Sequence, residues 1–168
     1  MRIGFGRDIH RFVENGRKFI LGGVKIPYEK DIDAHSDGDV LFHALAEAIL
    51  GALALGDLGT HFDENDDKYE NMDSSLIVKT TMSLMENLGY YIENVDISII
   101  TEKPKLKPYI NEIRNSIQKV LNIDLDRISV KAQTNEHIGD VGKGLAIDCY
   151  CAVLLEKSNN VSKWFFIC

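Results

Sequence analysis

Apolar residues recur at the spacing of an α-helix in three stretches of the chain. The first begins near residues 36 and 37 and ends at Gly56, the second runs from residue 74 or 75 to about residue 88, and the third follows Pro108. Short polar side chains cap free N–H groups at a helix start, and glycine favours a helix end. The pattern therefore predicts three helices, with the acidic and polar residues 57–73 forming a loop.

Shorter runs, in which apolar and polar positions alternate, predict the strands. Residues 2–6 and 9–13 indicate a strand with a kink at Gly6-Arg7, and Gly22-Gly23 favours a tight hairpin between residues 19–21 and 24–26. Further strands are predicted over residues 95–101, 128–134 and 145–155.

The order of these elements predicts one α+β domain over residues 1–157, followed by a C-terminal tail over residues 158–168. An α/β sandwich, in which a mixed sheet carries its helices on one face, fits this order. The length of 168 residues and the 45% hydrophobic content suffice for one real core.

Charge and cysteine usage narrow the function classes. A net charge of −7 argues against nucleic-acid binding, which needs clustered Lys and Arg. The most apolar stretch, residues 44–55, is too short to span a membrane. Cys149 and Cys151 would share one face of a strand, which places them poorly for a mutual disulfide. We expect reduced thiols and a cytoplasmic protein without nucleic-acid or membrane partners.

Three residues have the chemistry of a metal site. Asp8 and His10 would point to the same side of an extended segment, and His43 lies early in the first predicted helix. Three mixed nitrogen and oxygen ligands leave one tetrahedral position open, as in catalytic zinc sites. Asp39 or Glu47 could orient the His43 ring, because metal-bound imidazoles usually donate their other N–H. The alternatives are a surface ion pair for Asp8 and His10 and a packed histidine for His43.

Two strand exits could hold phosphates. Residues 101–106 and residues 131–136 each close a predicted strand, and no Walker loop or GxGxxG motif accompanies them. Threonine hydroxyls and backbone N–H groups can bind phosphate oxygens, and Glu136 could ligate Mg²⁺. The alternative is an ordinary passage from strand to loop. The acidic run at residues 63–67 lacks the Gly and Glu of an EF-hand, so we interpret it as a solvated loop.

The chain resembles the 2-C-methyl-D-erythritol 2,4-cyclodiphosphate synthase family over about residues 1–156. The order and spacing of several motifs carry the resemblance, and the segment Ala34-His35-Ser36-Asp37-Gly38-Asp39-Val40 is close to a family signature. The other motifs are Arg2-Ile3-Gly4, Asp8-Ile9-His10, residues 21–28, His43-Ala44-Leu45, residues 56–59, Asn94-Val95-Asp96 and Lys131-Ala132.

The resemblance implies cyclisation of a cytidine-diphosphate-linked substrate with release of CMP, in a homotrimer with active sites between subunits. It implies Zn²⁺, or another divalent transition metal, on Asp8, His10 and His43, and Mg²⁺ or Mn²⁺ on Glu136. It assigns His35 and Thr134 to transition-state stabilisation. The implied substrate-binding residues are Ser36, Asp57, Gly59, Phe62, Asp66, Thr101, Pro104, Lys105, Leu106, Ala132, Gln133, Asn135, Asp140 and Lys143.

Several positions depart from the family pattern. Phe62-Asp63-Glu64 replaces Phe-Pro-Asp, and Gln133 and Asn135 replace two threonines of a triple-threonine run. Asp140 and Lys143 replace an aromatic residue and an arginine, which in the family line a central trimer cavity that can hold an isoprenoid diphosphate. A charge is costly to bury, so Asp140 predicts weak or no binding of such a ligand.

Two other functions remain open at this point. A metal-dependent phosphohydrolase could use the same residues with water in place of the substrate's 2-phosphate. A trimeric binding protein that senses isoprenoid diphosphates is the other alternative. The complete set of Asp8, His10, His43 and Glu136 argues against an inactive binding protein.

Overall fold

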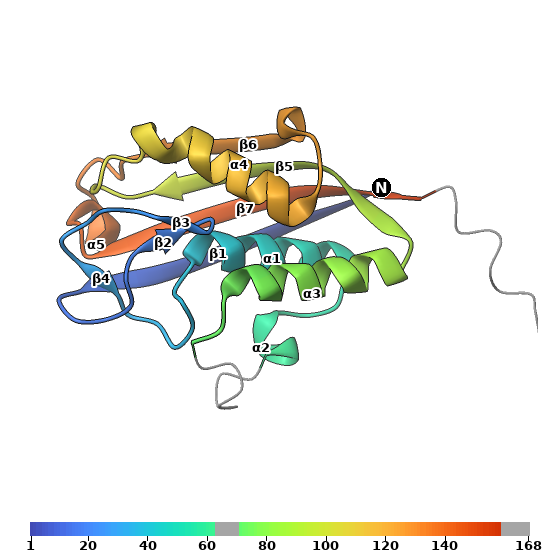
Figure 1. Cartoon of the computed structure of the whole chain (residues 1–168), viewed down its shortest axis with the longest axis horizontal. Helices are drawn as coiled ribbons and strands as arrows, with labels where there is room; N and C mark the ends of the chain where they lie inside the picture. The colour runs from blue at the N-terminus through green and yellow to red at the C-terminus, as the bar shows by residue number, and fades with distance from the viewer. Residues whose placement is uncertain (63–70, 159–168) are drawn as a thin grey trace, which may run out of the picture.

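The computed structural model describes residues 1–62 and 71–158 (Figure 1). Its main sheet has the strand order β4-β1-β7-β5-β6, in which β5 and β6 are parallel and the other neighbours antiparallel. These strands are β1 (Arg2–Val13), β4 (Asp31–Ile32), β5 (Tyr90–Ile100), β6 (Ile128–Gln133) and β7 (Ala146–Lys157). The predicted hairpin consists of β2 (Ile20–Leu21) and β3 (Val24–Lys25).

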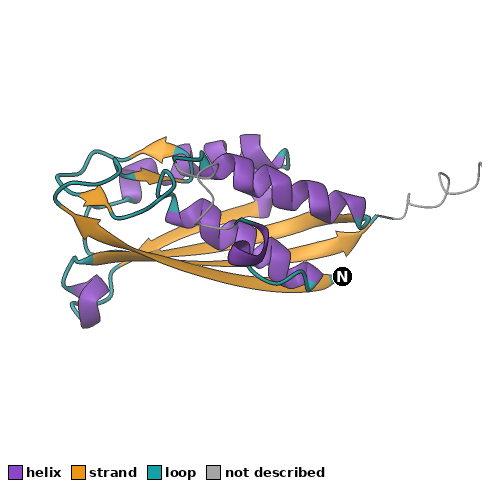
Figure 2. Cartoon of the chain, turned by 90° about the horizontal axis from the view of Figure 1, so that it is seen from below, coloured by secondary structure: helices purple, strands orange, loops and turns teal. Residues whose placement is uncertain are grey.

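The long helices cover one face of this sheet, as predicted (Figure 2). They are α1 (Val40–Leu53), α3 (Ser74–Asn87) and α4 (Ile110–Leu121). The short elements are α2 (Leu58–His61), the 3₁₀ helices η2 (Lys107–Tyr109) and η3 (Leu125–Arg127), and α5 (Gly139–Gly142). In the part of the chain that is described, no helix has the length and apolar character to cross a membrane.

Two glycines let β1 lie directly on α1. A Cβ on Gly4 would come 1.8 Å from the Ala48 carbonyl oxygen, and one on Gly6 would come 2.1 Å from the Ala44 carbonyl oxygen. Only glycine allows such a close approach of two backbones. Because alternate residues of a strand face the same side, Asp8 and His10 follow Gly4 and Gly6 on the helix-facing side. The glycines therefore bring these two side chains next to α1.

The other face of the sheet exposes apolar side chains. Ile3 and Phe5 of β1 are 76% and 66% exposed, and Ile9 is 45% exposed. Next to them Arg7 forms a two-pronged ion pair with the buried Asp148, with Arg7 Nε and one terminal nitrogen 3.0 and 2.8 Å from its carboxylate oxygens. The exposed apolar side chains form a strip along β1.

Four local predictions were wrong. β1 runs through Gly6-Arg7 without a break, because it pairs with β7 continuously from Arg2 to Arg11. β5 begins at Tyr90 instead of residue 95, because a register shift between Ile92 and Asn94 disturbs its alternation.

The first helix begins at Val40 with Asp39 as its N-cap, and not at residues 36 and 37. The Asp37 carboxylate instead accepts hydrogen bonds from the backbone N–H groups of Asp39 and Ser74. The predicted loop over residues 57–73 contains α2, whose N-cap is Asp57. Residues 63–67 lie outside the described part of the chain.

Candidate active site

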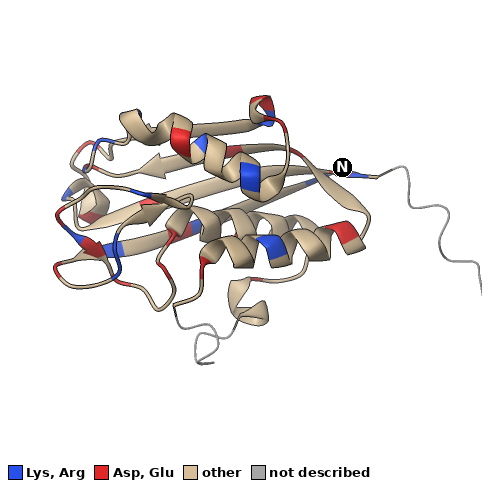
Figure 3. Cartoon of the chain, in the orientation of Figure 1, with Lys and Arg blue, Asp and Glu red and all other residues tan. Residues whose placement is uncertain are grey.

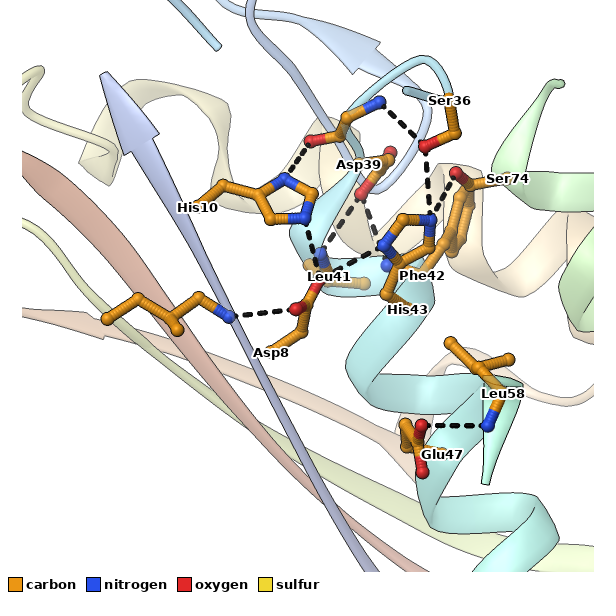
Figure 4. Close-up of polar contacts among 12 residues, drawn as sticks. Asp8, His10, Ser36, Asp39, Leu41, Phe42, His43, Glu47, Leu58 and Ser74 are labelled. Atoms are coloured by element: carbon orange, nitrogen blue, oxygen red, sulfur yellow. Dashed lines mark hydrogen bonds and ion pairs between the residues drawn. The ribbon is translucent and has the colours of Figure 1, made fainter. Parts of the chain in front are cut away.

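The three predicted metal ligands meet between β1 and the first turn of α1 (Figure 4). Asp8 Oδ2 lies 3.0 Å from His10 Nε2 and 3.0 Å from His43 Nδ1. One ligand atom from each residue lies within 4.8 Å of the other two. The side chains are 24%, 13% and 14% exposed, so an ion among them would be largely shielded from water yet reachable.

The outward ring nitrogens of both histidines have their own partners. His10 Nδ1 lies 3.1 Å from the Gly38 carbonyl oxygen, which can only accept, so this nitrogen carries a proton and Nε2 is the nitrogen that faces Asp8. His43 Nε2 lies 3.0 Å from Ser74 Oγ and 3.3 Å from Ser36 Oγ. Such partners fix the tautomer and orientation of metal-bound imidazoles.

Asp37 also belongs to this group of hydrogen-bond partners around the histidines, and the sequence analysis did not predict its role. Ser74 Oγ donates its proton to Asp37 Oδ1, so its lone pairs remain to accept the proton of His43 Nε2. His43 Nδ1 is then the ring nitrogen that faces Asp8, on the side where a cation would bind. Spacing gave no signal for this contact, because Asp37 and Ser74 lie 37 residues apart in the sequence.

The prediction that Asp39 or Glu47 orients His43 was wrong. Asp39 is fully buried and accepts four hydrogen bonds from backbone N–H groups of residues 22, 23, 41 and 42, at 2.6–3.1 Å. It therefore joins the β2–β3 hairpin to the start of α1. Glu47 accepts a 2.9 Å hydrogen bond from the Leu58 N–H and anchors α2.

The metal-ligand cluster favours a cation. Burial by itself would raise the pKa of Asp8, but the hydrogen bonds with His10 and His43 outweigh it and hold that pKa well below its ordinary value. Burial lowers the pKa of His10, and the adjacent Asp8 carboxylate outweighs this and raises it. A carboxylate with two imidazoles fits a divalent transition ion, which would displace the protons shared among the three groups.

A second group of predicted residues lies where the parallel strands β5 and β6 end. The Thr101 N–H donates to the Gln133 carbonyl oxygen at 3.1 Å, which joins the two strand exits. Thr134 Oγ1 donates a short hydrogen bond to Glu136 Oε1, so these two predicted functional side chains lie together. Ala132, Gln133 and Glu136 are exposed, and Thr134 and Asn135 are half-buried.

A pocket of about 360 Å³ opens beside these strand exits. The loops around residues 28–30, 102–105 and 137–144 line it, at the end of the molecule that carries α5 (Figure 1), where Figure 3 shows both blue Lys or Arg and red Asp or Glu segments. The predicted substrate residues Lys105 and Lys143 line it. Lys30 and Lys103 add two further amino groups, and Glu29 and Glu102 add two carboxylates. The four lysines outnumber the two glutamates, so the pocket keeps local positive charge in an acidic protein and suits an anionic ligand.

The remaining predicted residues are placed as follows. His35, Asp57 and Gly59 are exposed, Ser36 and Phe62 are half-buried, and Asp66 lies outside the described residues. Pro104 is half-buried, and Leu106 is 3% exposed and packs in the core. Asp140 and Lys143 are both exposed and lie 3.6 Å apart as an ion pair.

Within one chain, the metal-ligand cluster lies apart from the predicted residues at the ends of β5 and β6. Asp8 pairs with Cys149, Cys149 with Ile99, and Ile99 with Ala132, so Asp8 and Ala132 lie on the same line across the sheet. Three strand spacings separate them, which is roughly 14 Å. The metal-ligand cluster on β1 and the pocket at β5 and β6 are therefore distinct within one chain.

Comparisons with known proteins agree along nearly the whole chain. The model of the YgbB family matches residues 1–156. The 2-C-methyl-D-erythritol 2,4-cyclodiphosphate synthase of Brachyspira hyodysenteriae is 49% identical over 158 residues, which are 94% of this chain and 99% of that protein.

Solved structures give the same result. IspF of Plasmodium falciparum, in a complex with CDP, is 39% identical with a TM-score of 0.83, and the match covers 94% of this chain and 97% of that one. The bifunctional IspDF from Campylobacter jejuni has a TM-score of 0.88 and 37% identity, and 93% of this chain matches 42% of that chain.

Proposed function

The chain belongs to the YgbB family, and from this membership we propose that it cyclises 4-CDP-2-C-methyl-D-erythritol 2-phosphate to 2-C-methyl-D-erythritol 2,4-cyclodiphosphate and releases CMP. The protein is then a phosphorus–oxygen lyase of the non-mevalonate pathway to isoprenoid precursors. The observation that carries the proposal is the meeting of Asp8, His10 and His43, with their ligand atoms within 4.8 Å, in a chain of which 94% matches a named synthase.

The reaction needs positioning more than a protein nucleophile. An oxygen of the 2-phosphate forms a bond to the β-phosphorus, the bond from that phosphorus to the oxygen bridging to CMP breaks, and CMP leaves with its electron pair. Phosphoryl transfer of this kind depends on alignment of the reacting atoms and on neutralisation of charge. The chain must therefore hold two phosphate groups close together against their mutual repulsion.

We infer that Asp8, His10 and His43 hold Zn²⁺ or a similar ion, and that Glu136 holds Mg²⁺ or Mn²⁺. Bound divalent ions polarise phosphate oxygens and offset their charge. Ser74 and the Gly38 carbonyl keep the two imidazoles aimed at the ion site. Thr134 donates to Glu136, which would place its hydroxyl beside the proposed cation site and within reach of a phosphate oxygen. The exposed His35, next to Ser36, would stabilise the transition state.

The nucleotide would bind at the pocket beside β5 and β6. Lys105 and Lys143 supply positive charge there, and the loops that line the pocket leave the ends of β5 and β6, where the Thr101 N–H donates to the Gln133 carbonyl oxygen. The relative from Plasmodium falciparum is described with CDP. Ser36, Asp57, Gly59, Phe62 and Asp66 would contact the methylerythritol and ribose parts of the substrate.

We further propose a homotrimer whose active sites lie between subunits. The roughly 14 Å between Asp8 and Ala132 is too long for one chain to place a metal-held phosphate on the nucleotide pocket. The pocket of one subunit beside the metal ligands of the next would remove this gap. The exposed Ile3, Phe5 and Ile9 on the uncovered sheet face supply an apolar surface for such contacts. Residues 1–157 would act as one domain, with residues 158–168 as a tail.

Product analysis tests the proposed reaction. Wild-type protein with Zn²⁺ and Mg²⁺ should release one CMP for each cyclic diphosphate that mass spectrometry detects, and a His43→Ala variant should release neither. CMP accompanied by a linear phosphate, heavier than the cyclic product by one water, would overturn the cyclase proposal and favour a phosphohydrolase.

A further inference from the structure

Glu102 joins the two loops of the nucleotide pocket. Its Oε1 accepts hydrogen bonds from the Asn135 N–H at 3.0 Å and from the His137 N–H at 3.1 Å. The side chain is 10% exposed although it belongs to a surface loop. The hydrogen bond from the His137 N–H lowers the pKa of Glu102 below its ordinary value, so the side chain is a carboxylate at neutral pH.

These two N–H groups lie on either side of Glu136. Glu136 and His137 have φ values of +50° and +61°, a left-handed conformation that non-glycine residues rarely adopt. Residues 135–138 also close a turn, because the Ile138 N–H donates to the Asn135 carbonyl oxygen at 2.9 Å. Successive N–H groups in such a turn form a concave site for an anion, and Glu102 fills it.

The parallel pairing of β5 and β6 explains why Glu102 reaches this turn. Ile100 pairs with Gln133, so the chain leaves both strands at the same edge of the sheet. Glu102 stands two residues beyond Ile100, and the turn begins two residues beyond Gln133. The carboxylate therefore spans the short distance between two loops that the sheet already places side by side.

We propose that Glu102 is a positioning residue, which holds the turn at residues 135–137 so that Glu136 presents its carboxylate to a cation beside the nucleotide pocket. This inference rests on the proposed role of Glu136. Glu102 touches no reacting atom. It links the loop that would bind the nucleotide to the residue that would bind the cation, so that both take up one fixed arrangement before the substrate arrives.

A matched set of variants tests this role. Glu102→Met keeps the length of the side chain and removes its strong acceptor, whereas Glu102→Gln keeps a carbonyl oxygen that can accept both N–H groups. Glu86→Ala, at an exposed position of α3, is the control for loss of an acidic side chain. Metal-free samples of each are compared by amide hydrogen exchange at Asn135 and His137, and then by the Mg²⁺ concentration that gives half-maximal activity.

In Glu102→Met we expect faster exchange at both amides and a roughly tenfold to hundredfold rise in the half-saturating Mg²⁺ concentration. Glu102→Gln and Glu86→Ala should resemble wild type in both measurements. Unchanged exchange and an unchanged Mg²⁺ requirement in Glu102→Met would overturn the inference, even if its melting temperature fell.

The two proposals fail in different ways. If wild-type protein forms no cyclic product, the proposed function fails, whereas the exchange measurement still reports on Glu102. If Glu102→Met does not fold, Glu102→Ala gives a second removal of the acceptor, with the same expected and contradicting results. Equal loss of function in Glu102→Gln and Glu102→Met would also contradict a role that depends on the acceptor oxygen.

Discussion

Replacement of Gly6 by alanine tests how the backbone builds the metal-ligand cluster. The new Cβ would lie 2.1 Å from the Ala44 carbonyl oxygen and 2.5 Å from the Ala48 nitrogen, far inside the 3.4–4 Å of ordinary contact. Both atoms belong to the backbone of α1, so no side chain can turn away to make room. The strand must move away from the helix by an ångström or more, as a rough measure.

That movement should affect stability and metal binding together. Overpacking of this kind costs about 1–3 kcal/mol, and we expect Gly6→Ala to lower the free energy of unfolding by about the upper part of that range. Asp8 follows two residues after Gly6, and His43 directly precedes Ala44. The 3.0 Å contact between Asp8 and His43 would therefore lengthen, and the zinc dissociation constant should rise at least about tenfold.

Gly51→Ala is the matched control. Gly51 lies inside α1, and a Cβ there would meet only the Phe5 carbonyl oxygen at 3.7 Å, which is ordinary contact. Alanine is a better helix former by about 0.8–1 kcal/mol, so this variant should be slightly more stable than wild type. Urea unfolding and zinc titration calorimetry measure both effects. If Gly6→Ala matched Gly51→Ala in stability and zinc affinity, the close packing of β1 on α1 would not be what positions the cluster.

Three further outcomes follow from particular contacts. Ser74→Ala removes the acceptor of the His43 Nε2 proton, and calorimetry should show zinc affinity about tenfold weaker, whereas unchanged affinity would mean that Ser74 does not orient the ring. Phe5→Glu places a charge on the exposed apolar sheet face, and analytical ultracentrifugation should show loss of the proposed trimer; a trimer that persisted would place the interface elsewhere. Burial raises the pKa of the Cys149 and Cys151 thiols, so little thiolate is present at pH 8. In a Cys168→Ser variant, a thiol reagent should therefore react with these two cysteines only when the protein unfolds. Rapid reaction in the folded protein would contradict their burial.

The sequence predicted the elements whose pattern is local. The second long helix ends before Gly89, which has a φ of +75°, and the third follows Pro108, as expected from their stop and start residues. The sequence could not show that the Asp39 carboxylate accepts hydrogen bonds from the backbone of the hairpin at residues 22 and 23, because that contact depends on tertiary packing. The same limit made residue 36 look like a helix start, whereas Ser36 Oγ contacts His43 Nε2 and Asp37 accepts a hydrogen bond from Ser74 Oγ.

In the candidate site, too, local spacing was predictable and contacts between distant residues were not. The spacing of Asp8 and His10 on a strand predicted a shared side, and the structure brings both to His43. Ser74 and Glu102 could not be found by spacing, because each acts across more than 30 residues of sequence. Their roles arise from packing of α3 beside α1 and from the parallel pairing of β5 with β6.

The most direct test of the account is phosphorus NMR of the purified protein with 4-CDP-2-C-methyl-D-erythritol 2-phosphate, before and after one equivalent of Zn²⁺ is added to metal-stripped protein in the presence of Mg²⁺. We predict that the signals of the substrate persist without Zn²⁺, and that its addition yields CMP and a cyclic diphosphate. Equal turnover of stripped and reconstituted protein, or a linear phosphate as the product, would contradict the claim that Asp8, His10 and His43 form the metal site of a cyclase.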